Sequence, residues 1–323
     1  MTADAAQPQR VLVTGASGFV GRHVCAALSA AGFRVRALLR NPAAREALGK
    51  SVDSVHLGSV TDVASLDGAA GDCAAIVHLV GIINEAENTF EHIHVDGTRN
   101  VLREANRVGV RRFVYLSGLG ARPDAPARYH QTKAAAEKLV AESVPEGYSF
   151  QASIIFGPED DFLNLFVKFA RNRFDLRYPP WPIMPLIAGG RTLLQPIWVG
   201  DVAAVLTRAC APDFPSRIPP GVYQLGGPEA LSVRQIMNVA CAVAKQKRVF
   251  VNIPLSVARV LAMVLEKTSS HPLLTRDQLA MLTEDGRAHA NATARILGRP
   301  GRRLWDYARE DLLGQPPRVE VGA

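Results

Sequence analysis

The chain has 323 residues, of which 48% are hydrophobic and 21% charged, as expected for a globular protein with a sizeable core. Its formal net charge is +7, but it carries no basic run interleaved with aromatic residues and no nucleic-acid-binding signature, so we expect no nucleic-acid partner. Four scattered cysteines without a CxxC pair are typical of reduced thiols in the cytoplasm. The N-terminus is polar and no apolar run reaches about 18 residues, so neither a secretory signal nor a transmembrane segment is predicted.

A glycine-rich turn near the N-terminus is the strongest local signal. Three β-formers lead into Thr14, glycines follow at 15, 18 and 21, and a helical pattern of apolar residues begins at Val20. In such a turn the first glycine permits the sharp bend, the second lets the backbone approach a pyrophosphate, and the third lets the helix pack closely on the strand. The free N–H groups at the helix start would then face the anion.

Strands and helices alternate through the N-terminal half. Strands are expected at 34–40, 52–57, 74–80 and 112–117, and helices at 61–66 (capped by Thr61), 88–108 and 129–143. This alternation predicts an α/β protein with a Rossmann-type parallel sheet that is doubly wound, with helices on both faces.

The alternation stops after Gly157. The proline-rich segment 177–190 is incompatible with a regular helix or a central strand, and 195–202 and 222–225 are expected to be short extended pieces. We therefore expect residues 10–155 to form the dinucleotide-binding domain, with 195–225 returning to it. Residues 156–194 and 226–315 would form a smaller, irregular α+β C-terminal lobe for a substrate or a partner.

Arg40 indicates the cofactor. Dinucleotide-binding domains use an acid at the end of the second strand to hold the 2′-hydroxyl of NAD, or an arginine to accommodate the 2′-phosphate of NADP. Here that position, about twenty residues after the glycines, is Arg40. The sequence therefore predicts NADP(H) as the preferred cofactor, with NAD(H) as the alternative.

Tyr129 and Lys133 form a candidate acid/base pair. They are four residues apart on one predicted helix and so share a face. An ammonium near a phenol stabilises the phenolate and lowers the pKa of the tyrosine, which lets it act as a general acid or base.

Other candidates are weaker. His92 and His94 lack a third metal ligand, so no metal site is expected, and the acidic run 159–161 is better explained as a loop or helix start. The segment 255–265 is almost wholly apolar but too short to span a bilayer; a core helix is preferred, with an interfacial or quinone-facing helix as the alternative.

Taken together, the motifs resemble the extended short-chain dehydrogenase/reductase family, which includes NAD-dependent epimerase/dehydratase-like proteins. They comprise residues 14–21 (TGASGFVG), 78–81 (HLVG), 96–98 (DGT) and the Tyr129/Lys133 pair. Residues 117–121 (SGLGA), 153–158 (SIIFGP), 160–164 (DDFLN) and 195–202 (QPIWVGDV) resemble one atypical branch. This branch contains the nucleotide-binding accessory subunit of respiratory complex I, its bacterial relatives and a relative implicated in ubiquinone biosynthesis. The resemblance runs from about residue 10 to about residue 285.

The resemblance implies a site position by position. The three glycines would hold the pyrophosphate, Arg40 the 2′-phosphate, and Lys133 the nicotinamide ribose. The candidate catalytic residues are Ser117, Tyr129 and Lys133. The candidate cofactor-binding residues are Thr14, Gly15, Ser17, Gly18, Phe19, Val20, Gly21, Arg40, Ser59, Val60, Leu79, Val80, Gly81 and Lys133.

Three departures from the family bear on function. Active members place a catalytic Ser or Thr one residue beyond Ser117, where this chain has Gly118; Ser59 replaces an Asp that often meets the adenine; and Gln151-Ala152 replaces an Arg-Pro pair. Two hypotheses stay open. One is a structural or sensory nucleotide-binding protein of a respiratory or quinone-related assembly, cytoplasmic or peripheral at the inner face of a membrane. The other is an NADPH-dependent reductase or epimerase-like enzyme that acts on a small carbonyl compound through Tyr129 and Lys133.

Overall fold

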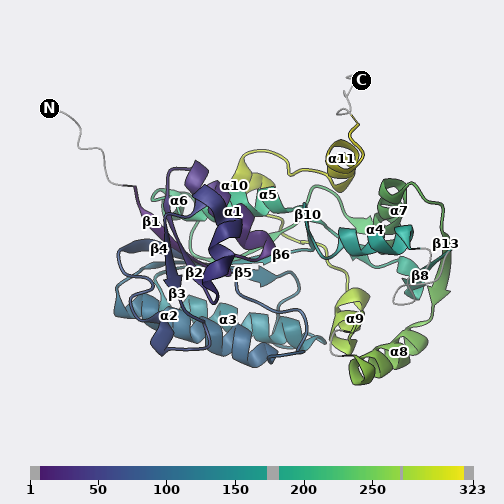
Figure 1. Ribbon diagram of the computed structural model, residues 1–323, viewed down its shortest axis with the longest axis horizontal. Coiled ribbons are helices and arrows are strands. Elements are labelled where there is room, and N and C mark those ends of the chain that lie inside the picture. The colour runs from purple at the N-terminus through teal and green to yellow at the C-terminus, as the bar shows by residue number, and fades with distance from the viewer. Residues whose placement is uncertain (1–7, 173–181, 270–271, 316–323) are drawn as a thin grey trace. The chain divides into compact units, whose positions relative to one another are not determined.

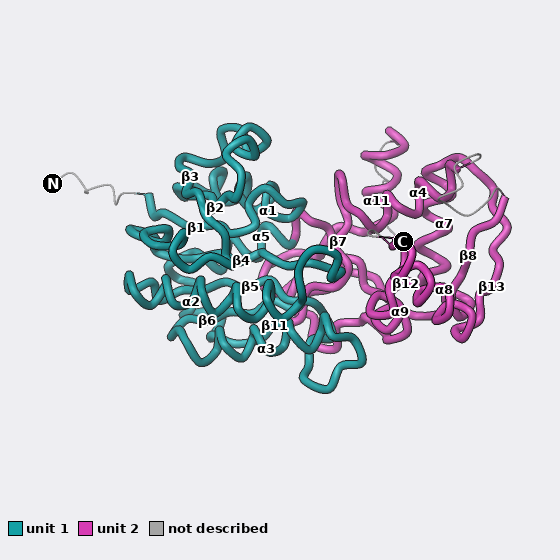
Figure 2. Tube along the Cα trace, turned by 60° about the horizontal axis from the view of Figure 1, so that its bottom comes forward, with its two compact units in different colours: residues 1–151, 202–223 teal, residues 152–201, 224–323 magenta. Residues whose placement is uncertain are grey.

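The computed structural model describes residues 8–172, 182–269 and 272–315 and divides the chain into two compact units (Figures 1 and 2). The first unit comprises residues 1–151 and 202–223, and the second comprises residues 152–201 and 224–323. Within the described ranges, every helix is too short or too polar to cross a bilayer.

The first unit contains a seven-stranded sheet with the strand order β11-β6-β5-β4-β1-β2-β3. The strands are β1 (Arg10–Thr14), β2 (Arg34–Leu39), β3 (Ser54–Leu57), β4 (Cys73–His78), β5 (Arg112–Gly118), β6 (Glu146–Ala152) and β11 (Gly221–Leu225). All registers from β3 through β2, β1 and β4 to β5 are parallel. The expected doubly wound Rossmann-type sheet is confirmed.

Helices cover both faces of this sheet (Figure 1). Helices α2 (Gly97–Arg107) and α3 (Arg128–Ser143) lie on one face, and α1 (Phe19–Ala30) and α5 (Val199–Ala209) lie on the other, with the short α6 (Phe214–Arg217) following. Leu12, Ile76 and Phe113 from the strands pack with Leu102 and Val140 from the helices. Strands enclosed in this way are buried on both faces, which is why β4 has an almost continuous apolar sequence.

The short connections differ in part from expectation. Thr61 does not cap the segment after β3: the turn is 3₁₀, η2 (Ala64–Leu66), and Asp62 accepts hydrogen bonds from the amides of Ala64 and Ser65. Thr61 instead bonds the hydroxyl of Ser59. The helix expected at 88–108 begins as one π-helical turn, η3 (Glu91–Asp96), before α2. A further 3₁₀ segment, η1 (Pro42–Ser51), follows β2.

The described residues of the second unit form three two-stranded sheets and several short helices. The strand pairs are β7 (Ile155–Phe156) with β10 (Ile197–Trp198), β8 (Ile183–Ile187) with β13 (Val249–Ile253), and β9 (Leu193–Leu194) with β12 (Leu231–Ser232). The helices are α4 (Leu163–Arg171), α7 (Val233–Ala244), α8 (Leu255–Thr268), α9 (Arg276–Thr283), α10 (Thr293–Leu297) and α11 (Leu304–Tyr307), with η4 (Ala188–Gly190) and η5 (Ala308–Leu312). The core of this unit lies mainly between α4 and α7. Part of the expected proline-rich segment, residues 177–181, lies outside the described residues, and Pro185 lies in β8 of a two-stranded sheet.

The preferred interpretation of residues 255–265 as a core helix is wrong. Helix α8 forms there, but Ala258 and Ala262 are its only buried residues, and most of its large aliphatic side chains are exposed. The inward face of α8 consists of small residues that pack closely, so the apolar character of the segment did not indicate burial.

Candidate functional site

The glycine turn after β1 has the geometry that its sequence predicts. Gly15 has φ of +71°, which L side chains rarely adopt, and a Cβ there would lie 3.2 Å from the backbone of Leu79 and Val80. A Cβ on Gly21 would lie 2.1 Å from the carbonyl oxygen of Gly15. Only glycine permits this packing of α1 on the turn.

The start of α1 offers an anion site in the backbone. Gly18 donates its amide to the carbonyl of Gly15, and the first helical bond of α1 runs from Arg22 to Gly18. The amides of Phe19, Val20 and Gly21 therefore precede the first helical donor and have no acceptor within the helix. In α1 no side chain caps this end and no acid lies in the first turn. This end of the helix can accept a phosphate through backbone N–H groups and the helix dipole.

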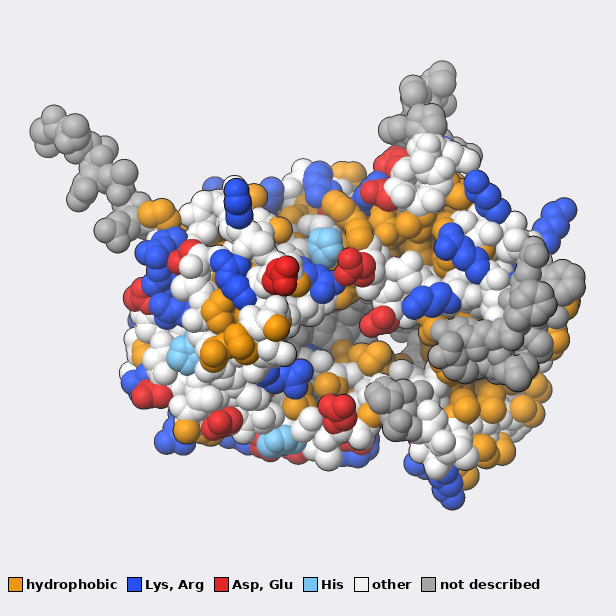
Figure 3. All heavy atoms as spheres, viewed as in Figure 1, with side chains coloured by type: hydrophobic (Ala, Val, Ile, Leu, Met, Phe, Trp, Pro, Cys, Tyr) orange, Lys and Arg blue, Asp and Glu red, His pale blue; other side chains and the backbone are white. Residues whose placement is uncertain are grey.

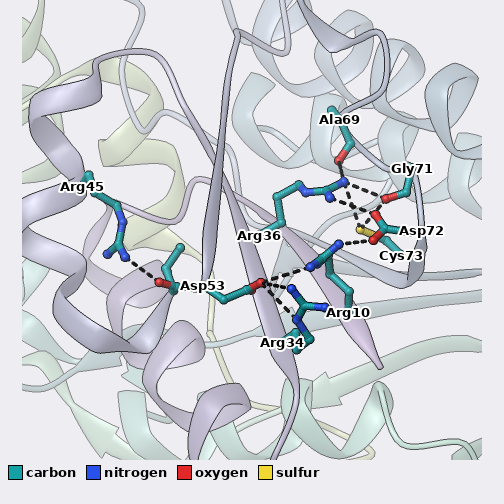
Figure 4. A network of polar contacts seen from close by, with 10 residues as sticks. Arg10, Arg34, Arg36, Arg45, Asp53, Ala69, Gly71, Asp72 and Cys73 are labelled. Carbon is teal, nitrogen blue, oxygen red and sulfur yellow. Dashed lines mark hydrogen bonds and ion pairs between the residues drawn. The ribbon is translucent and has the colours of Figure 1, made fainter. Parts of the chain in front are cut away.

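Arg40 lies at the carboxyl end of the sheet, directly after β2, with an exposed side chain. Within the described chain it has no hydrogen bond or ion pair. The arginines near the amino ends of the strands differ, as Figure 4 shows: Arg10 and Arg34 pair with Asp53, and Arg36 pairs with Asp72 at 2.8 Å. Arg40 is thus available to an anionic ligand at the edge where the glycine turn lies.

Ser59 and Val60 follow β3 at the same edge. The Ser59 hydroxyl bonds the Thr61 hydroxyl at 2.9 Å, and the carbonyl of Val60 accepts a hydrogen bond from Asn100. The side chain of Val60 is buried against Gly97, where a Cβ would lie 3.0 Å from Val60 Cγ2. Ser59 can contact a ligand at this edge, whereas Val60 serves mainly as packing.

Leu79, Val80 and Gly81 continue from β4 toward the buried end of Lys133. The amide of Leu79 donates to the carbonyl of Thr14, so this segment lies beside the glycine turn. A Cβ on Gly81 would lie 3.0 Å from Lys133 Nζ. The absence of a side chain at Gly81 therefore lets the ammonium reach the segment.

Lys133 is a buried cation. Its side chain is 3% exposed, Nζ donates to the carbonyl of Leu116 at 3.1 Å, and Nζ lies 4.9 Å from the centroid of the Tyr115 ring. Burial lowers the pKa of Lys133 to about 8, while the charge of Glu137 acts in the opposite direction. An amine with this pKa can exchange its proton near neutral pH.

Tyr129 occupies the space beside Gly118. A Cβ on Gly118 would lie 2.8 Å from Cε1 and 3.2 Å from the hydroxyl of Tyr129. The tyrosine ring also packs edge-on against His94, with ring centroids 5.4 Å apart, and against Phe90 at 6.0 Å. A Ser or Thr at position 118 would overlap the phenol in this arrangement.

Ser117 lies on the other side of this region, next to a buried acid. It is 4% exposed and its buried hydroxyl has no hydrogen-bond partner in the described chain, whereas the carboxylate of Glu137 accepts hydrogen bonds from Gln151 at 3.1 Å. Burial raises the pKa of Glu137. The amide of Gln151 also bonds the carbonyl of Ala121. Gln151, at the position of the family's arginine, therefore acts as a structural link beneath the site.

Sequence reasoning missed a chain of buried hydrogen bonds below the site. His78 bonds Thr14 at 2.6 Å and Thr98 at 3.1 Å, while His94 bonds Thr132 at 2.9 Å and the backbone of Ile82 at 3.1 Å. Burial, with the nearby charge of Lys133, lowers the pKa of His78 to about 3 and that of His94 to about 2, so both are neutral. The available signal was that His78 lies in the HLVG motif.

The other polar candidates have structural roles. Asp160 is 3% exposed and accepts hydrogen bonds from the amides of residues 157 and 162–164, so it holds the start of α4, as the helix-start interpretation predicts. Asp201, from the QPIWVGDV motif, is fully buried and binds Arg299 at 2.7 Å and the amide of Arg302 at 2.7 Å. No cluster of three or more metal-ligating side chains occurs in the described part of the chain.

Comparison with known proteins identifies a nucleotide-binding region in the N-terminal half of the chain. Residues 15–146 match a family model described as NAD(P)H-binding. The chain is 27% identical over 295 residues to the mitochondrial NADH dehydrogenase [ubiquinone] 1 alpha subcomplex subunit 9 of Arabidopsis thaliana, covering 87% of this chain and 71% of that protein. It is 30% identical over 202 residues to the ceramide reductase of Caulobacter vibrioides, covering 62% of this chain and 60% of that protein.

A solved structure shares the fold across both units. The NADPH-dependent quinone oxidoreductase QOR2 of Escherichia coli, solved with NADPH, superposes with a TM-score of 0.71 at 18% identity, covering 92% of this chain and 98% of that one. The fold is therefore one that also occurs in an oxidoreductase.

Proposed function

The chain carries an NAD(P)H-binding domain and is homologous to the accessory subunit family of complex I, an atypical branch of the extended short-chain dehydrogenases/reductases; from this premise we propose that it binds NADP(H) in a structural or sensory role. The bound nucleotide would stabilise a protein that serves a respiratory or quinone-related assembly at the inner face of a membrane. Arg40, which has no partner in the described chain, supports the preference for the 2′-phosphate of NADP(H).

The contact between Gly118 and Tyr129 carries the proposal. In the active members of the family that the sequence resembles, carbonyl reduction uses two hydroxyls, one from the acid/base tyrosine and one from a neighbouring Ser or Thr. Here position 118 has no hydroxyl, and the phenol ring fills the space that a side chain would need. The hydroxyl of the preceding residue, Ser117, is buried. The residues around Tyr129 are therefore better suited to holding a nucleotide than to polarising a substrate.

An active NADPH-dependent reductase is the second candidate. Its support is the buried Lys133, whose pKa of about 8 fits it to assist a tyrosine on the same helix, and the similarity to a ceramide reductase. The nicotinamide would supply the hydride, and Tyr129 would supply the proton at the substrate oxygen.

Two substitutions separate the candidates. Under the structural hypothesis Tyr129→Phe keeps NADPH affinity and restores function in a strain lacking the gene, whereas Lys133→Ala weakens both. Under the enzymatic hypothesis both variants lose function, because proton transfer by a general acid typically contributes about 10²–10⁴ in rate. Tyr223→Phe and Lys138→Ala, which change a tyrosine and a lysine away from the site, are the matched controls.

The decisive measurement is complementation beside a fluorescence titration with NADPH. Loss of function in Tyr129→Phe with normal melting temperature and normal NADPH binding would overturn the structural role. Failure of the wild-type protein to bind either NADPH or NADH would overturn both candidates.

A further inference from the structure

Helix α8 of the second unit displays an apolar stripe on its exposed side. Val257, Val260, Leu261 and Val264 are all exposed, Val260 at 60%. At about 100° per residue these four side chains fall within an arc of about 100°. Figure 3 shows the corresponding gathering of apolar side chains over α8. An amphipathic helix on the surface of a soluble domain usually has its apolar stripe on the buried side. In α8 the large apolar side chains lie on the exposed side instead.

The inward side of α8 is already packed. Ala258 and Ala262 are fully buried, and Glu266 near the end of α8 pairs with Arg276 of α9 at 2.7 Å. These contacts fix α8 with its large side chains outward. The stripe therefore cannot reach the core of its own unit by a simple rotation of the helix.

The charges on α8 are those of a surface that approaches an anionic partner. Arg259 and Lys267 are exposed and have no acidic partner in the described ranges, whereas the only acid of the helix, Glu266, is neutralised by its ion pair. Arg259 lies about 100° around the helix from Val260, beside the exposed Met263, and Lys267 lies at the end of the helix in line with Val260. Long basic side chains at these places can extend toward phosphate groups while the aliphatic residues enter an apolar layer.

From this arrangement we infer that α8 is a membrane-docking helix, which lies in the plane of a membrane surface that carries anionic lipids. Its 14 residues span about 21 Å, which is too short to cross a hydrocarbon core. The stripe consists of aliphatic side chains without a hydrogen-bonding group or an aromatic ring. Protein–protein interfaces obtain most of their binding energy from Tyr, Trp and Arg, so hydrocarbon is the better match.

Vesicle flotation tests this inference on the full chain. The wild-type protein should float with vesicles of phosphatidylcholine and phosphatidylglycerol, bind vesicles of phosphatidylcholine alone at least about tenfold less, and dissociate at high salt. The double variant Val260→Asp/Leu261→Asp should lose at least about tenfold in partitioning. Val222→Asp, at a valine of β11 that is 51% exposed, is the matched control and should bind like the wild type.

Charge variants complete the test. Arg259→Gln/Lys267→Gln should reduce binding to anionic vesicles and leave the weak binding to phosphatidylcholine unchanged, while Lys138→Gln should change neither. Melting temperatures and NADPH titrations establish that each variant is folded, so a failure here is distinct from a failure of nucleotide binding. The inference is overturned if the wild type binds neither kind of vesicle. It is equally overturned if Val222→Asp loses as much vesicle binding as the α8 variant Val260→Asp/Leu261→Asp. It is also overturned if the α8 variant changes only the oligomeric state, which would assign the stripe to a second copy of the chain.

Discussion

The two units use apolar sequence in opposite ways. In the first unit, the apolar strands β1 and β4 lie between two layers of helices and are almost fully buried. In the second unit, the equally apolar α8 exposes its large side chains. The first unit has a seven-stranded sheet that can cover apolar helices, whereas the sheets of the second have two strands each. Burial of an apolar segment thus depends on whether its unit provides a surface large enough to cover it.

The largest effect should come from the closest contact of the first unit. Gly21→Ala would place a Cβ 2.1 Å from the carbonyl oxygen of Gly15. Because the Cβ would meet backbone atoms, α1 must move, and we expect a loss of about 3 kcal/mol in unfolding free energy together with loss of NADPH binding. Urea unfolding and a cofactor titration measure the two effects, with Ser29→Ala on the exposed side of α1 as control. A stable variant with unchanged binding would show that the turn does not form the site.

Acid should weaken the first unit through its buried histidines. The folded-state pKa values of His78 and His94 are about 3 and 2, below the ordinary 6.5. Between about pH 3 and pH 6.5 the unfolded chain binds more protons than the folded chain, so stability falls as the pH falls, by up to about 1.4 kcal/mol per pH unit for each histidine. Urea unfolding from pH 7 to pH 4 should show this slope.

His78→Gln is the variant that isolates this effect, because Gln cannot gain a proton. The variant should be less stable at pH 7, since its bonds to Thr14 and Thr98 are altered, but its stability should depend less on pH. An unchanged slope would mean that His78 is not the titrating group.

Arg40 and Arg34 distinguish the two ends of the sheet. Arg40→Asp should weaken NADPH binding by about ten- to a hundredfold, because a hydrogen bond to a charged group contributes about 1.5–3 kcal/mol. NADH binding should be unchanged or stronger. Arg34→Gln, which breaks the pair with Asp53 at the amino end, should leave the preference between the cofactors intact. Equal affinities of the wild type for NADPH and NADH would contradict the assignment of Arg40 to the 2′-phosphate.

The smallest effect is expected on the surface of α8. Val260→Ser should change the unfolding free energy by less than about 0.5 kcal/mol, as is usual for an exposed position. Val24→Ser, at a fully buried position of α1, should cost at least about 1 kcal/mol because it buries a hydroxyl. Parallel urea titrations compare the two. A large loss of unfolding free energy in Val260→Ser would mean that α8 is covered in solution. The contrast between the buried strands of the first unit and the exposed α8 would then not hold.

Much of the first unit could be predicted from the sequence because its signals are local. The bend at Gly15, the close approach at Gly21 and the alternation of strands with helices each follow from steric rules that act over a few residues. The spacing of Tyr129 and Lys133 placed them on one helix, α3, for the same reason. The family's motifs added the expectation of a nucleotide, which the NAD(P)H-binding match supports.

Tertiary contacts decided the rest. The sequence does not distinguish His94, which turns inward from the π-helical turn to bond Thr132, from His92, which stays exposed. It shows that Gly118 lacks a hydroxyl, but only the fold places the Tyr129 ring in the vacated space. It shows that residues 255–265 are apolar, but only the packing of Ala258 and Ala262 turns the larger side chains outward. Composition fixes how apolar a segment is, whereas its burial depends on which surfaces distant parts of the chain bring against it.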